Sequence, residues 1–78
     1  MPRLRLFGPA KEAAGTGNVL APGATVGEML MWASATFGPA FEQVLASSRV
    51  WVNGEAAEPD WLVVDTDEVA ILPPSSGG

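Results

Sequence analysis

The chain has neither cysteine nor histidine among its 78 residues, and no other feature of the sequence restricts its folding as much. A domain of this size buries only roughly 60% of the surface that its unfolded chain exposes, and many such domains add disulfides or a structural zinc site. Both devices rely on cysteine or histidine side chains. The sequence therefore predicts one small globular domain that is stabilised by its 47% of hydrophobic residues, with or without help from a partner protein.

The composition also limits the chemistry and the partners that are open to the chain. Thiol nucleophiles and imidazole acid–base groups are missing, so we expect a substrate or carrier role, with no catalytic side chain and no metal site. A formal net charge of −5 argues against nucleic acids and anionic membranes and suits a basic docking groove. No apolar run approaches the roughly 20 residues of a membrane span and no leader opens the chain, so a cytoplasmic location is expected.

Two strands are predicted before the middle of the chain. Residues 3–7 alternate between polar and apolar types, which places Leu4 and Leu6 on one face and Phe7, with two arginines, on the other. Residues 18–21 form a short apolar run after a glycine-rich turn. We expect this second strand to pair back on the first.

The main helix is predicted to begin at the sequence Thr25-Val26-Gly27-Glu28, which has the spacing of a capping box, and to stop at Gly38-Pro39. Shorter helical segments are expected over residues 11–14 and 41–45. The main helix should bury one stripe of residues at helical spacing, which are Val26, Met29, Leu30, Ala33 and Phe37.

Two further strands are predicted over residues 49–52 and 68–72. Asn53-Gly54 follows the first of them and is a strong signal for a two-residue hairpin turn. The acidic residues of the segment 65–68 are potential metal ligands, but the segment lacks the length and the glycine placement of a calcium loop. A solvated turn is the preferred interpretation.

This order of elements predicts an α+β roll in which one main helix lies across one face of a mixed sheet. The other face is expected to carry Phe7, Trp51 and Leu72, because each points away from the core residues of its own strand. Exposed together, they would form an apolar patch of the kind that binds a partner. Alternatively, a bulge or a loop covers them, and Trp32, which lies off the helix stripe, is then the next candidate.

The last residues are the best candidates for the functional part of the chain. They are Pro73, Pro74, Ser75, Ser76, Gly77 and Gly78. Proline resists collapse onto the body, and glycine lets the backbone enter a channel too narrow for side chains. Extended, this segment reaches roughly 20 Å. We therefore expect a body over residues 1–72 and a flexible tail over residues 73–78; the alternative is that the tail is merely linker sequence.

Several of these segments together resemble the MoaD family, the small subunit of molybdopterin synthase. The matching segments are Leu6-Phe7-Gly8, Lys11-Glu12, Gly15, Thr25-Val26, Leu30, Val52-Asn53-Gly54, the run Asp67–Pro74 and the final Gly77-Gly78. The resemblance covers the whole chain. It implies the β-grasp, or ubiquitin-like, fold. One departure is Ser75-Ser76, where relatives often carry an apolar or branched residue.

The resemblance implies a carrier cycle. An ATP-dependent activating enzyme of the MoeB type adenylates the carboxylate of Gly78, and sulfur transfer then gives a thiocarboxylate. A large subunit of the MoaE type, in a heterotetramer, takes in the tail and uses the sulfur to build the dithiolene of molybdopterin. ATP belongs to the activating enzyme, and the chain itself binds no cofactor.

The resemblance also bears on docking, and it leaves other functions open. Phe7 and Leu72 match apolar docking positions of the family. Trp51 is predicted as a docking residue only because it points to the opposite side of its strand from Val50 and Val52. One alternative is a related carrier that serves thiazole, cysteine or tRNA thiolation. Another is a binding or modifier domain without a sulfur role.

Overall fold

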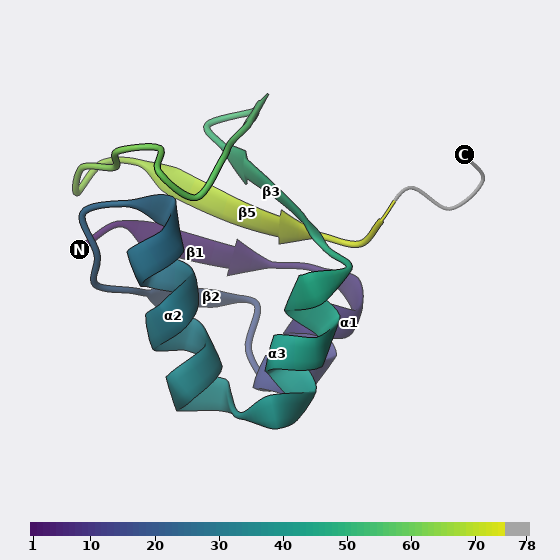
Figure 1. The fold of residues 1–78 in the computed structure, drawn as a ribbon. Coiled ribbons are helices and arrows are strands. Elements are labelled where there is room, and N and C mark those ends of the chain that lie inside the picture. Colours follow the sequence, from purple (N-terminus) through teal and green to yellow (C-terminus); the bar gives the residue numbers. More distant parts are fainter. Residues whose placement is uncertain (75–78) are drawn as a thin grey trace.

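The computed structural model describes residues 1–74, which form a mixed sheet and three helices (Figure 1). In chain order the elements are β1 (Arg3–Leu6), α1 (Gly8–Ala14), β2 (Asn18–Leu20), α2 (Val26–Phe37), α3 (Pro39–Ala46), β3 (Arg49–Val52), β4 (Glu55–Ala56) and β5 (Glu68–Leu72). None of these helices is long and apolar enough to cross a membrane.

The five strands lie in the order β2-β1-β5-β3-β4. The central strands β1 and β5 run parallel, although they come from opposite ends of the chain, and the remaining pairs are antiparallel. The predicted pairing of the second strand on the first is confirmed. The α+β roll with a mixed sheet is confirmed as well.

The helices cover one face of the sheet, with α2 crossing it and α3 below the start of β3 (Figure 1). The core lies between these layers and buries alternate residues of β1 and β5 against α2 and α3. Its buried hydrophobic residues are Leu4, Leu6, Ala10, Ala21, Val26, Met29, Ala33, Phe41, Val52, Val63, Val69 and Ile71. Of the predicted helix stripe, Leu30 and Phe37 are only partly buried.

The start of α2 has the predicted capping box. The Oγ1 atom of Thr25 accepts a hydrogen bond from the backbone N–H of Glu28 at 3.2 Å. Glu28 Oε1 in turn accepts from the N–H of Ala24, the residue before the cap, at 2.8 Å. Both bonds satisfy N–H groups that lack a partner within the helix, which explains why α2 begins at Val26.

The short helices α1 and α3 are longer than predicted, because each begins at or before a proline that was taken as a break. Pro9 and Pro39 both occupy the first turn of their helices. At that position the missing N–H costs nothing, and the fixed φ of proline suits a helix. Phe7 therefore ends outside β1, as the residue that precedes α1.

The hairpin between β3 and β4 has the predicted turn, with φ values of 49° at Asn53 and 87° at Gly54. Asn53 also ties this turn to the acidic one, because its side-chain amide donates to Asp67 at 2.9 Å and its Oδ1 accepts from the N–H of Glu68 at 3.0 Å. Asp67 Oδ2 accepts from the N–H of Val64 at 2.8 Å. The backbone bond and then the Asn53 bond hold the pKa of Asp67 below its ordinary value of 3.8. Both carboxylate oxygens of Asp67 thus accept hydrogen bonds that stabilise this turn.

Candidate functional site

The open face of the sheet, opposite the helices, brings together residues from three strands. Trp51 lies beside Ala70, which lies beside Arg5, and paired residues of neighbouring strands share a face. Leu72 and its partner Arg49 form the next row along the strands. Along β1, β3 and β5, the residues of this open face therefore alternate with the residues that point into the core.

Phe7 joins this group although it lies beyond the end of β1. Its backbone is extended, with φ −130° and ψ 155°, and its N–H donates to the carbonyl oxygen of Ile71 at 3.2 Å. The guanidinium carbon of Arg5 lies 5.5 Å from the centroid of the Phe7 ring, which is cation–π distance. Because Arg5 lies on the open face, this contact places the Phe7 ring there too.

We refer to Arg5, Phe7, Trp51, Ala70 and Leu72 as the open-face patch. The structure thus brings the three predicted docking residues to one face. Phe7 is 38% exposed and Trp51 36% exposed, so no loop of residues 1–74 covers them. Leu72 is half-buried.

Two residues of this patch, Arg5 and Ala70, were not among the predicted docking residues, and Arg5 is the charged one. Besides the Phe7 contact, its Nη1 lies 3.3 Å from Glu68 Oε2, an exposed ion pair. Arg3 and Arg49 lie on the same face, one row away on either side. The alternation of residues 3–7 had already placed Arg3 and Arg5 on the same strand face as Phe7. This pattern is the feature of the sequence from which Arg5 could have been predicted. The patch therefore combines apolar contact area with a positively charged group.

The predicted tail begins directly beside this patch. Pro73 follows Leu72, and both Pro73 and Pro74 are exposed. The ring of Pro73 lies against Gly8, 3.6 Å from the place where a Cβ on that glycine would be. The other predicted tail residues, Ser75, Ser76, Gly77 and Gly78, lie outside the described residues.

Trp32, the alternative docking residue, belongs instead to the helix layer. Its ring stands edge-on to Phe37, with 6.0 Å between centroids, and Phe37 in turn lies 5.2 Å from the ring of Phe41. Phe41 is fully buried. Trp32 therefore packs against the core and does not share a face with Trp51.

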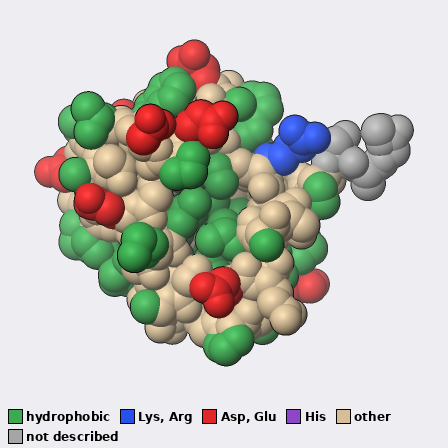
Figure 2. Space-filling view, in the orientation of Figure 1, with side chains coloured by type: hydrophobic (Ala, Val, Ile, Leu, Met, Phe, Trp, Pro, Cys, Tyr) green, Lys and Arg blue, Asp and Glu red, His purple; other side chains and the backbone are tan. Residues whose placement is uncertain are grey.

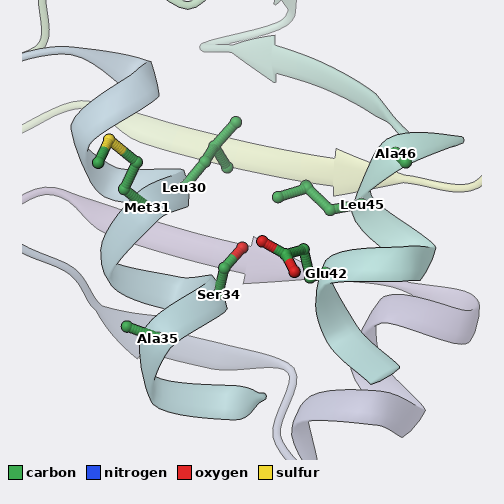
Figure 3. A pocket seen from close by; sticks show the side chains of 7 residues that line it. All are labelled: Leu30, Met31, Ser34, Ala35, Glu42, Leu45 and Ala46. Carbon is green, nitrogen blue, oxygen red and sulfur yellow. The ribbon is translucent and has the colours of Figure 1, made fainter. Parts of the chain in front are cut away.

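A concave surface, which the sequence did not indicate, lies between α2 and α3. It is a groove of about 560 Å³ lined by Leu30, Met31, Ser34 and Ala35 of α2 and by Glu42, Leu45 and Ala46 of α3 (Figure 3). Figure 2 shows this side of the molecule, with hydrophobic side chains in the hollow and acidic side chains around it. Leu30, predicted as a core residue, lines this groove.

Similarity to known proteins agrees with this architecture. The ThiS family matches residues 4–78. The crystal structure of SAMP1 from Haloferax volcanii is 32% identical, with a TM-score of 0.81, and the match covers 99% of this chain and 98% of that one. The solution structure of small archaeal modifier protein 1 from Methanosarcina acetivorans is 28% identical, with a TM-score of 0.88 and coverages of 99% and 95%.

The same fold occurs in a complex of subunits 1 and 2 of molybdopterin-converting factor from Helicobacter pylori. The matching chain is 22% identical, with a TM-score of 0.71 and coverages of 99% and 97%. The β-grasp fold that the family resemblance implied is therefore confirmed. With a family match over almost its whole length, the chain belongs to the ThiS family of ubiquitin-like sulfur carriers.

Proposed function

We propose that this chain is the sulfur-carrying small subunit of a molybdopterin synthase, and that the carboxylate of Gly78 is the group that carries sulfur. The observation that supports this most is the family match, which extends through Gly77 and Gly78 to residue 78. The fold adds a second argument, because the open-face patch ends at Leu72, immediately before Pro73 and Pro74. A partner bound to the patch would receive the tail beside its own surface.

The proposed reaction has three steps, which are activation of the carboxylate, loading of sulfur and donation of sulfur. The Gly78 carboxylate attacks the α-phosphorus of ATP and releases pyrophosphate, which gives an acyl-adenylate. A hydrosulfide equivalent attacks the acyl carbon, and AMP leaves, so that the product is a thiocarboxylate. The thiocarboxylate sulfur then attacks an electrophilic carbon of the acceptor and displaces an oxygen leaving group from it. Water cleaves the acyl–sulfur bond, which restores the carboxylate of this chain and leaves the sulfur on the acceptor as a thiol. No cysteine, histidine, metal or cofactor of this chain is needed.

The open-face patch is the proposed docking site for two partners in turn. An activating enzyme of the MoeB type would supply ATP chemistry, and a large subunit of the MoaE type would supply the catalytic residues, in a heterotetramer located in the cytoplasm. The solved complex of subunits 1 and 2 from Helicobacter pylori supports a protein partner for this fold. Phe7 and Trp51 present the aromatic contact area that is typical of interface anchors.

A protein modifier is a second candidate, because small archaeal modifier protein 1 is 32% identical over nearly the whole chain. The first step would be the same. An amine of a target protein would then attack the acyl-adenylate, so that an amide forms and AMP leaves. Carriers for thiazole, cysteine or tRNA thiolation would follow the thiocarboxylate route and differ in the acceptor.

Intact-mass spectrometry tests the proposal. The chain is incubated with its activating enzyme, ATP, Mg²⁺ and sodium sulfide, and exchange of oxygen for sulfur should add about 16 Da. A chain that lacks Gly78 is the matched control and should keep its mass. The modified chain is then mixed with a large subunit and the pyranopterin precursor, and dithiolene formation is measured. An unchanged mass contradicts the sulfur-carrier role, whereas a thiocarboxylate that this large subunit never consumes contradicts only the molybdopterin assignment.

A further inference from the structure

The groove between α2 and α3 is the second surface that is shaped to bind a partner. Its volume of about 560 Å³ lies within the range of protein binding pockets, roughly 300–1,000 Å³. Figure 3 shows Leu30 of α2 and Leu45 of α3 along its two sides. Met31 also lines the groove and is 74% exposed, so most of its side chain is available for contact with a ligand. The lining is thus mainly apolar and open to solvent.

The groove also contains a carboxylate without a cation beside it. Ser34 and Glu42 point toward one another across the groove (Figure 3). Within residues 1–74 the ion pairs are Met1–Asp65 and Arg5–Glu68, so Glu42 has no cationic partner there. An exposed carboxylate that has no cationic partner and lines a mainly apolar groove favours a ligand that brings a positive charge with its apolar group.

None of the four cationic side chains lines the groove, and three of them lie on the opposite face of the sheet. Arg3, Arg5 and Arg49 lie on the open face of the sheet. Lys11 extends along Gly17, 3.2 Å from the place where a Cβ on that glycine would be. The groove therefore favours a basic partner, whereas the arginines of the open face favour an acidic one.

We infer that this groove binds an amphipathic, basic helix of a partner protein. A third helix can lie in the depression between two neighbouring helices at the usual spacing of roughly 8–10 Å. Its leucine-type side chains would insert between Leu30 and Leu45 and contact Met31, as in other helix-in-groove complexes. A lysine or arginine one turn away would reach Glu42. This inference does not depend on the proposed function.

Charge disfavours a second copy of this chain as the occupant. Each copy carries a formal net charge of −5, and α1, α2 and α3 together contain one basic residue, Lys11. The groove and the open-face patch lie on opposite sides of the sheet. A partner helix can therefore occupy the groove while another protein occupies the patch.

The test uses a designed peptide of about four helical turns as the probe. It carries leucines at positions i, i+3, i+4 and i+7 and lysines on the flanking positions; a second peptide has glutamates in place of the lysines. Each is titrated into the ¹⁵N-labelled protein, and amide shifts are recorded. The lysine peptide should shift the amides of Leu30, Ser34 and Leu45 and leave those of Arg5 and Trp51 unchanged.

Two exposed residues of the groove provide the decisive variants. Met31→Asp should weaken binding of the lysine peptide at least about tenfold, because a carboxylate replaces an apolar contact. Glu42→Lys should weaken it about fivefold and should make the glutamate peptide the better ligand. Leu62→Asp is the matched control, since Leu62 is also 74% exposed but does not line the groove, and it should bind like the parent.

Circular dichroism verifies that each variant is folded. The inference is overturned if the lysine peptide binds folded Met31→Asp and the parent equally well, or if it shifts the open-face patch instead of the groove. It is also overturned if neither peptide shifts any amide at millimolar concentration, or if sedimentation shows that the parent chain dimerises whereas Met31→Asp stays monomeric.

Discussion

Gly23 lies in the connection between β2 and α2, and the structure predicts that even an added methyl group would be rejected there. Its φ is +149°, a conformation that side chains rarely adopt. A Cβ at this position would lie 2.8 Å from the backbone nitrogen of Met29 and 3.0 Å from its Cγ. Met29 is fully buried in the core, so α2 cannot move away without disturbing its packing.

The expected cost of Gly23→Ala combines two terms. Overpacking at a buried contact costs roughly 1–3 kcal/mol, and an unfavourable φ costs roughly another 1–3 kcal/mol. Their sum is about 4 kcal/mol. At roughly 0.05–0.15 kcal/mol per residue, the whole chain has a free energy of unfolding of about 4–12 kcal/mol, so the substitution removes a large share of it.

Gly54→Ala is the matched control. Gly54 also has a positive φ, +87°, but no atom lies within 4 Å of the place where its Cβ would be. This substitution should therefore cost only the conformational term, about 1 kcal/mol. The clash with Met29 should therefore account for most of the difference in cost between the two variants.

Urea denaturation measures both costs as free energies of unfolding, and thermal unfolding measures the melting temperatures. Both are followed by tryptophan fluorescence and circular dichroism. We expect the melting temperature of Gly23→Ala to fall by more than about 15 °C and that of Gly54→Ala by about 4–8 °C. The denaturant slope should stay constant for both variants. Equal losses in the two variants would refute the argument, because they would mean that the close approach of Gly23 to α2 has no energetic weight.

Three further predictions concern the turns, the tail and the patch. Asn53→Gly keeps the hairpin conformation but removes a hydrogen bond from Asp67, so the pKa of Asp67 should rise toward 3.8 in a carboxyl-carbon NMR titration. Because that pKa is lowered in the folded state, its stabilising effect is present above the unfolded value and is lost as pH falls through the folded one; an unchanged pKa would contradict this. Gly77→Val should abolish sulfur transfer in the mass assay with unchanged thermal unfolding, whereas a large fall in melting temperature would assign the tail to the fold. Phe7→Asp and Trp51→Asp should fold as monomers yet bind the large subunit at least about thirtyfold more weakly by calorimetry, and parental affinity would place the docking site elsewhere.

Features that depend on a few neighbouring residues were predictable from the sequence. The capping residues Thr25 and Glu28 begin α2 where expected, and Gly38 ends it. Asn53-Gly54 forms the predicted hairpin, because this pair tolerates positive φ at both turn positions. The alternation in β1 and β5 correctly separated the open-face residues from the core. These are local preferences of the backbone and of one strand or helix.

Features that depend on contacts between distant segments needed the tertiary structure. Gly8-Pro9 and Gly38-Pro39 were interpreted as breaks, but Pro9 and Pro39 lie in the first turns of α1 and α3, two helices that pack onto each other. The groove between α2 and α3 depends on the spacing of the two helices. Helical periodicity alone therefore could not show that Leu30, predicted as a core residue, lines this groove.

The sequence by itself thus determined most of the elements, the faces of the strands and the family, but not the strand β4 or the starts of α1 and α3. Only the tertiary structure decided that β5 lies between β1 and β3, which is what brings Phe7, Trp51 and Leu72 onto one patch with Arg5 between Phe7 and Glu68. The physical reason is distance along the chain. A strand's own alternation is set by its backbone, whereas its neighbours and register are set by the burial of one shared core, to which residues more than 60 positions apart contribute together.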